Sequence, residues 1–220
     1  MKISFGCITN DAYRLNTVLK KSVLPGKLHY NINPESATKG LNELLDLMDS
    51  DVAILVHQDM YFRQGWYEKV KEQLALLPDS WTVAGIIGKD MEGRMCGKIH
   101  DMRIVDNINT EEIHTFPHEC VCIDECVIIV NQKTGFRFVE ELDGFDLYGT
   151  MCVLQAWEMG GTAWIIDAWA EHYCTRPFSW FPPEAFKIRY KWLYAKYQEQ
   201  FKTVDSTVFI SKPRFETSAA

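Results

Sequence analysis

The sequence predicts an α/β fold in which helices flank a mainly parallel sheet, and three observations support this. The first 90 residues alternate between short apolar runs and segments whose apolar residues have helical spacing. Residues 51–56 form an almost wholly apolar run, typical of a central strand with helices on both faces. The chain has 220 residues, 47% of them hydrophobic and 24% charged, which suits one large domain with a substantial core. A disordered chain is therefore excluded.

Local signals place each element of the first 90 residues. Strands are expected where short apolar runs lie between turn signals, at residues 2–9, 28–32, 51–56 and 81–87. Helices are expected after the capping residues Asn10 and Asp11, after residues 33–35, and over residues 65–77. Pro25-Gly26 ends the first helix and Pro78 ends the third. This alternation predicts a parallel, right-handed, doubly wound sheet.

The pattern changes after residue 90. The expected elements are a hairpin within 88–107, a long strand at 120–130, a helix at 145–159, a strand at 162–168 and an aromatic, basic helix at 183–202. The sequence contains no repeat, low-complexity segment or linker. We therefore expect a single domain over residues 1–220, in which 1–90 and 91–175 form two halves and 176–220 form a C-terminal aromatic loop and helix.

Charge and composition exclude several function classes. Thirty acidic and 23 basic residues give a net charge of −7, which argues against nucleic-acid binding because phosphate contacts need a clustered basic surface. No apolar run approaches the ~20 residues that span a bilayer, and the N-terminal segment lacks the flanks of a signal peptide. Seven cysteines, an odd number, are typical of buried, reduced thiols. We therefore expect a cytoplasmic protein.

His57 and Asp59 follow the apolar run 51–56. This is the carboxyl end of a central strand, where open α/β sheets bind ligands. Residues two apart in an extended segment project to the same side, so this imidazole and carboxylate could share a divalent cation. His172, at the end of the run 164–172, is a candidate for a further ligand. The plainer interpretations are a helix-capping Asp59 and a structural, hydrogen-bonded His172.

These residues carry a resemblance to a known family. Residues 53–66 resemble the segment around the DXD-type motif of family 2 glycosyltransferases, in a small bacterial subgroup that writes it His-Gln-Asp before a Gly-Trp helix start. Residues 136–149 are similar to the acceptor-side region, and residues 170–172 to the late strand that supplies a metal-ligand histidine. The ordered set covers roughly residues 1–175. It implies the GT-A fold, a Rossmann-like mixed, mainly parallel sheet with flanking helices.

The resemblance implies that a sugar is transferred, with inversion, from a nucleoside diphosphate donor to a carbohydrate or lipid-linked acceptor. Residues 1–90 would form the nucleotide-binding half and 91–175 the acceptor-side half. Asp59, with His57 and His172, would hold a Mn²⁺ or Mg²⁺ ion that neutralises the charge developing on the diphosphate.

Other residues are candidates for donor binding. Thr9, Asn10 and Asp11 lie where such folds receive the nucleoside, although helix capping explains Asn10 and Asp11 equally well. Lys89 and Arg94 are candidates to reach a donor phosphate from the stretch 85–94. That stretch lacks the spacing of known phosphate-binding loops, and a hairpin turn is the simpler interpretation.

The sequence departs from the family where the catalytic base is expected. The family has an acidic residue at the start of the helix, whereas this chain has Gly149-Thr150-Met151, and none of these can act as a base. Asp143 and Asp146 lie just upstream, and we favour Asp146 because a loop carboxylate before a helix is exposed and adjustable. The departure supports an alternative function, a nucleotide- or sugar-binding protein that keeps the fold without transfer.

Two further features allow other interpretations. A His/Cys cluster could bind a fold-stabilising zinc ion, although buried free cysteines on a strand explain it more simply. Its members are His114, His118, Cys120, Cys122 and Cys126.

In the C-terminal helix, aromatic residues from Phe186 to Phe201 recur at helical spacing. Packing on the core is the plainer interpretation; a contact between copies or a peripheral membrane contact near a lipid-linked acceptor is the alternative. The loop 176–183 would cover an acceptor.

Overall fold

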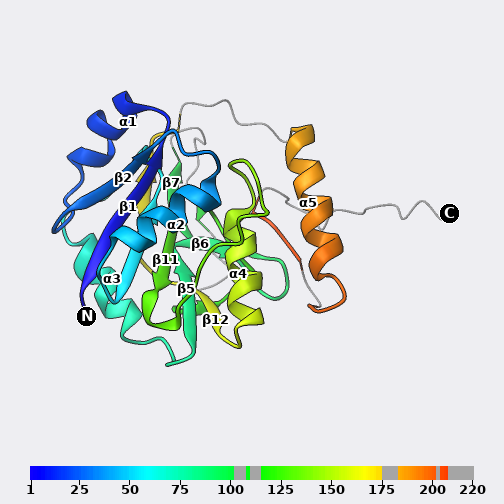
Figure 1. Ribbon diagram of the computed structural model, residues 1–220. Coiled ribbons are helices and arrows are strands. Elements are labelled where there is room, and N and C mark those ends of the chain that lie inside the picture. The colour runs from blue at the N-terminus through cyan, green and yellow to red at the C-terminus, as the bar shows by residue number, and fades with distance from the viewer. Residues whose placement is uncertain (102–107, 110–114, 175–182, 202–203, 208–220) are drawn as a thin grey trace.

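The computed structural model describes residues 1–220 apart from 102–107, 110–114, 175–182, 202–203 and 208–220 (Figure 1). Its main sheet has the strand order β2-β1-β3-β11-β5-β12-β9. The bounds of these strands are, in that order, Leu28–Ile32, Ile3–Thr9, Val52–Val56, Val127–Asn131, Trp81–Gly85, Thr162–Ile165 and His118–Glu119. A second sheet has the order β10-β6-β7-β13-β4, with β8 paired to β7. Their bounds are Cys122–Ile123, Ile87–Lys89, Met95–Asp101, Ala170–His172, Met60–Tyr61 and, for β8, Ile108–Asn109.

The main sheet is mixed and mainly parallel, as predicted. β1 pairs in parallel with β2 and β3, and β12 pairs in parallel with β5. However, β11 lies between β3 and β5 and is antiparallel to both, so β3 and β5 are not neighbours but still run in the same direction as β1 and β2, as the alternation in the first 90 residues predicts. A strand that comes from far along the chain separates two strands that follow each other in sequence.

The two faces of β3 explain why its sequence is apolar throughout. Ala53 and Leu55 point into one core, and Val52, Ile54 and Val56 point into the other. The first core is closed by the helices α2 (Ala37–Leu47), α4 (Tyr148–Glu158) and α5 (Glu184–Tyr197). The second is closed by α1 (Ala12–Thr17), the 3-10 turn η1 (Leu19–Lys21) and α3 (Trp66–Leu74). A short 3-10 turn, η2 (Gln132–Thr134), follows β11.

Two expected long strands are broken in the structure. The run 120–130 contains β10, a turn at Asp124-Glu125 and then β11, and the Asp124 carboxylate accepts a hydrogen bond of 3.0 Å from the Cys126 N–H. The expected strand at 162–168 ends at Ile165 as β12, and the run 164–172 continues into β13, which belongs to the other sheet. The expected strand at 81–87 likewise divides into β5 and β6. The predicted hairpin after residue 88 is confirmed, because β6 and β7 pair antiparallel.

The C-terminal helix packs on the domain. α5 lies beside α4 (Figure 1), and the buried side chains of Phe186, Tyr190, Leu193 and Tyr197 join the core that contains α2 and α4. The Tyr197 hydroxyl hydrogen-bonds the Glu158 carboxylate at the end of α4, 3.1 Å away. The plainer interpretation of the aromatic residues in this helix, that they pack on the core, is therefore confirmed.

No helix in the described residues is long and apolar enough to cross a membrane. The aromatic loop 176–183 falls almost wholly outside the described residues, and the single-domain assignment stays a prediction.

Candidate active site

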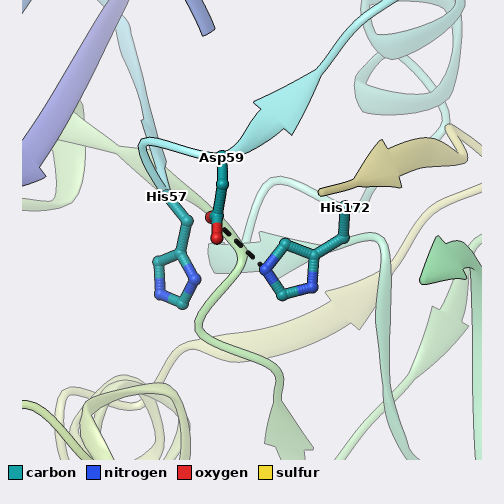
Figure 2. Close-up of side chains that lie close together, drawn as sticks. All are labelled: His57, Asp59 and His172. Atoms are coloured by element: carbon teal, nitrogen blue, oxygen red, sulfur yellow. Dashed lines mark ion pairs between the residues drawn. The ribbon is translucent and has the colours of Figure 1, made fainter. Parts of the chain in front are cut away.

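The structure brings together His57, Asp59 and His172, the three predicted metal ligands (Figure 2). One ligand atom from each lies within 4.8 Å of the others. His57 follows β3, and its N–H donates to the Cys126 carbonyl at 3.0 Å. Asp59 precedes β4, which pairs with β13 so that Met60 faces His172. Strand pairing therefore joins two segments that are more than a hundred residues apart.

His172 lies between two carboxylates. Its Nε2 is 3.3 Å from Asp59 Oδ1, and its Nδ1 is 3.1 Å from Asp101 Oδ2. Asp101 is buried at the end of β7, directly opposite His172 in the parallel β7–β13 pair. Burial alone would lower the pKa of His172, but hydrogen bonds and charge from Asp101 and Asp59 outweigh it and raise the pKa to about 10. A hydrogen bond from Nδ1 to Asp101 leaves Nε2 directed at Asp59, which is how carboxylates orient metal-binding histidines.

The other two predicted ligands have equally defined surroundings. Burial would raise the pKa of Asp59, but the hydrogen bond from His172 and the charges of His172 and His57 lower it, so Asp59 is a carboxylate. The Tyr148 hydroxyl at the start of α4 lies 2.7 Å from His57 Nε2. Two imidazoles and one carboxylate fit a divalent transition metal. Of the two predicted ions they favour Mn²⁺, because Mg²⁺ prefers oxygen ligands alone.

Gln58 links this group to the predicted nucleoside-binding residues. Its side-chain carbonyl accepts a hydrogen bond from the Thr9 hydroxyl and from the backbone N–H groups of Asn10 and Asp11, at 3.0 and 3.1 Å. Its amide donates to the Asn10 side chain at 3.1 Å. The end of β1 and the end of β3 are thus joined by one side chain. Asp11 also caps α1 by accepting from the Arg14 N–H at 3.0 Å, so the capping interpretation holds for Asp11.

Lys89 and Arg94 are not brought to this group. The Lys89 side chain is 2% exposed, and its ammonium lies 3.0 Å from the equally buried Asp205 carboxylate. Arg94 pairs with Asp90 at 2.7 Å across the β6–β7 turn, and the Asp90 carboxylate accepts hydrogen bonds from two N–H groups of that turn. The hairpin interpretation of residues 90–94 therefore explains Arg94, and the buried ion pair with Asp205 explains Lys89.

The predicted bases Asp143 and Asp146 both contact one arginine. Arg189 of α5 donates from Nε to Asp143 at 2.8 Å and from Nη1 to Asp146 at 3.0 Å. These carboxylates therefore tether α5 to the loop before α4. Gly149, Thr150 and Met151 are buried within the first turn of α4. Sequence reasoning missed Gln58 and Asp101 as well as Arg189, because each acts on residues far away in the chain.

The described members of the alternative zinc cluster do not gather as a metal site. Within the described parts of the chain, the group of possible metal ligands that gathers is the one at His57, Asp59 and His172. Cys120, Cys122 and Cys126 are buried, and burial raises the pKa of each thiol, so they are neutral core side chains. His118 lies on β9, and His114 lies outside the described residues.

No family model and no curated protein sequence matches the chain. Solved structures do. A mannosyltransferase from Pyrobaculum calidifontis, PcManGT, in complex with GDP-Man and Mn²⁺, aligns with a TM-score of 0.51 and 8% identity over 93% of this chain and 65% of that chain. S. aureus TarS 1-349 in complex with UDP aligns with a TM-score of 0.51 and 14% identity, over 89% and 65%. The same fragment with UDP-GlcNAc gives 0.50 and 15%, over 89% and 66%.

The chain thus spans just under two thirds of the length of each of these structures. At such low identities the likeness shows the fold alone. Membership of family 2 and the His-Gln-Asp form of its motif stay predictions. The fold itself is the one that the sequence resemblance implied: a mixed α/β, GT-A-like fold, shared with glycosyltransferases that use nucleotide sugars.

Proposed function

We propose that the protein is a glycosyltransferase that takes a sugar from a nucleoside diphosphate donor with the help of a divalent cation, with inversion at the anomeric carbon. One observation carries this proposal: Gln58 joins the group of His57, Asp59 and His172 to the end of β1. The proposed cation site and the proposed nucleoside site would therefore lie side by side at the carboxyl ends of the strands. A nucleoside diphosphate has a nucleoside at one end, which would meet the end of β1, and a diphosphate at the other, which would meet the cation.

Each part of the site has a separate role in this proposal. The end of β1, with Thr9, Asn10 and Asp11, would hold the nucleoside through side-chain and backbone polar groups. His57, Asp59 and His172 would hold Mn²⁺ or Mg²⁺, which supplies positive charge for a diphosphate leaving group. Asp101 orients His172, and Tyr148 positions His57, so both imidazoles are already directed toward the cation.

The similar structures support the class of donor. PcManGT was solved with GDP-Man and Mn²⁺, and TarS 1-349 with UDP and with UDP-GlcNAc. UDP and GDP are therefore the first nucleotides to test. The acceptor in this proposal is a carbohydrate or a lipid-linked sugar. A cytoplasmic location, a peripheral membrane contact and a homo-oligomer stay predictions from the sequence.

A second function is favoured by the start of α4. Gly149, Thr150 and Met151 stand where the resemblance places an acidic residue, and Arg189 holds both Asp143 and Asp146. A protein that binds a nucleotide or nucleotide sugar without transferring it would need only the cation and nucleoside sites. Transfer activity in the presence of bound donor distinguishes the two functions.

The test is a calorimetric titration with UDP, GDP and dTDP, with and without Mn²⁺. We expect one nucleotide to bind only with Mn²⁺, and Asp59→Ala to abolish that binding because the carboxylate ligand is lost. Asp49→Ala is the matched control, since the Asp49 side chain is fully exposed and pairs only with Lys2 among the described residues. Failure of all three nucleotides to bind, or equal binding by Asp59→Ala, would contradict the proposal.

A further inference from the structure

Glu125 brings a carboxylate to the start of α4 from a neighbouring turn. It follows Asp124 in the turn between β10 and β11 and is partly buried. The Gly149 N–H, in the first turn of α4, points at Glu125 Oε1 at 3.5 Å. A helix N-terminus favours negative charge, so this position suits a carboxylate.

Gly149 shows why the carboxylate comes from outside the helix. A Cβ at position 149 would lie 2.1 Å from the Ile123 carbonyl oxygen and 3.3 Å from Glu125 Cγ. The first contact is with backbone and excludes any side chain at this position. The second shows that Glu125 fills the space beside it. The acidic group that is missing from the helix is therefore replaced in space by a residue from the adjoining turn.

Two contacts connect this turn to the cation site. The Cys126 carbonyl, one residue after Glu125, accepts the His57 N–H at 3.0 Å. Tyr148, one residue before Gly149, contacts His57 Nε2 at 2.7 Å. Cys126, the neighbour of Glu125, and Tyr148, the neighbour of Gly149, therefore both contact His57.

The charged groups around Glu125 are mainly acidic. Asp124 and Asp146 face it, together with the Tyr148 side chain, while Arg189 contacts Asp146. Among the ion pairs of the described residues, none involves Glu125. Burial, then the charges of Asp124 and Asp146, raise the pKa of Glu125 to about 8. Near neutral pH a fraction of such a group is ionised, and the ionised form takes up a proton more readily than an ordinary carboxylate.

Resting on the proposed function, we infer that Glu125 is the general base of sugar transfer, in place of Asp146 or Asp143. The acceptor hydroxyl oxygen bonds to the anomeric carbon while the bond from that carbon to the diphosphate oxygen breaks. The electron pair of the broken bond leaves with the diphosphate, and the hydroxyl proton passes to the Glu125 carboxylate. Asp143 and Asp146 keep the structural role of holding Arg189.

The test uses water as the acceptor, so that no acceptor needs to be known. UDP-GlcNAc and GDP-Man are incubated with the full chain and Mn²⁺, and release of the nucleoside diphosphate is measured for wild type, Glu125→Gln and Asp146→Asn. We expect Glu125→Gln to lower the rate about 100- to 10,000-fold, the range for loss of a general base. Its affinity for the nucleotide with Mn²⁺ stays unchanged, which also shows that it is folded. Asp146→Asn is expected to stay within a few-fold of wild type.

Three outcomes would overturn the inference. Glu125→Gln could turn over at the wild-type rate, Asp146→Asn could show the larger loss, or wild type could bind donor and release no product. In each of these the nucleotide still binds, so the proposed function of the cation and donor site is judged separately. Absence of nucleotide binding in wild type contradicts the proposed function itself, and the assignment of Glu125 fails with it.

Discussion

The carboxylates at the cation end of the sheet and those that face the C-terminal segment differ in their partners. Asp59 and Asp101 contact the imidazole of His172, whereas Asp146 contacts Arg189 and Asp205 contacts Lys89. An imidazole can exchange its proton for a metal ion, whereas the guanidinium of Arg189 and the buried ammonium of Lys89 stay paired. The carboxylates beside His172 can therefore change partners during a reaction, while those beside Arg189 and Lys89 hold the fold together. The chemical partner, more than the type of residue, separates the aspartates of the proposed cation site from those that hold the fold together.

The largest expected effect comes from breaking the buried pair of Lys89 and Asp205. Lys89→Met leaves the Asp205 carboxylate, 1% exposed, without its counter-charge. Loss of one partner of a buried ion pair typically costs about 3–5 kcal/mol of the free energy of unfolding. Urea denaturation measures this loss. Nucleotide affinity is expected to stay unchanged, because Lys89 lies away from the cation site.

A double variant completes this prediction. Lys89→Met with Asp205→Leu removes both charges, and we expect it to regain most of the lost stability. A drop in nucleotide affinity that follows Lys89 alone would show instead that this lysine reaches the donor phosphate.

The next effect concerns the orientation of His172. Asp101→Asn keeps the shape of the side chain but removes the charge that accepts the Nδ1 hydrogen bond, so His172 presents Nε2 to a cation less often. We expect the affinity for Mn²⁺, measured calorimetrically with the nucleotide present, to fall about 10- to 100-fold. The overall fold, measured by circular dichroism, should stay the same. An unchanged affinity would place His172 outside the cation site.

A further effect is on the pH dependence of stability. The pKa of Glu125 is about 8 in the folded protein and near 4.5 when exposed, so between these values the folded state holds a proton that the unfolded state has released. Ionisation of Glu125 therefore lowers stability as pH rises from about 4.5 to 8. Glu125→Gln removes this loss. Its melting temperature relative to wild type should be higher at pH 8 than at pH 5, and an equal difference at both pH values would contradict the raised pKa.

Local sequence signals predicted the ends of the strands and therefore where the candidate cation ligands lie. Residues 28–32 match β2, and 51–56 match β3 within one residue, which places His57 and Asp59 at a strand end. What local signals could not predict was pairing across the chain. The β7–β13 register brings Asp101 to His172, 71 residues away, and Arg189 reaches Asp146 across 43 residues.

Glu125 was missed for a different reason. The run 120–130 is apolar apart from Asp124 and Glu125, and its overall hydrophobicity outweighed them in the prediction of one long strand. Two adjacent acidic residues inside such a run are a turn signal, and Asp124 does form a hydrogen-bonded turn. The same two residues could have located both the break between β10 and β11 and the carboxylate beside α4.

The central claim is that a cation binds between His57, Asp59 and His172 beside a nucleotide. Crystals grown with Mn²⁺ and UDP or GDP test it most directly, by anomalous diffraction at the manganese absorption edge. The account predicts one strong anomalous peak within coordination distance of the Asp59 carboxylate and His172 Nε2, next to the diphosphate. A bound nucleotide with no peak at this position, or with manganese held by other residues, would contradict it.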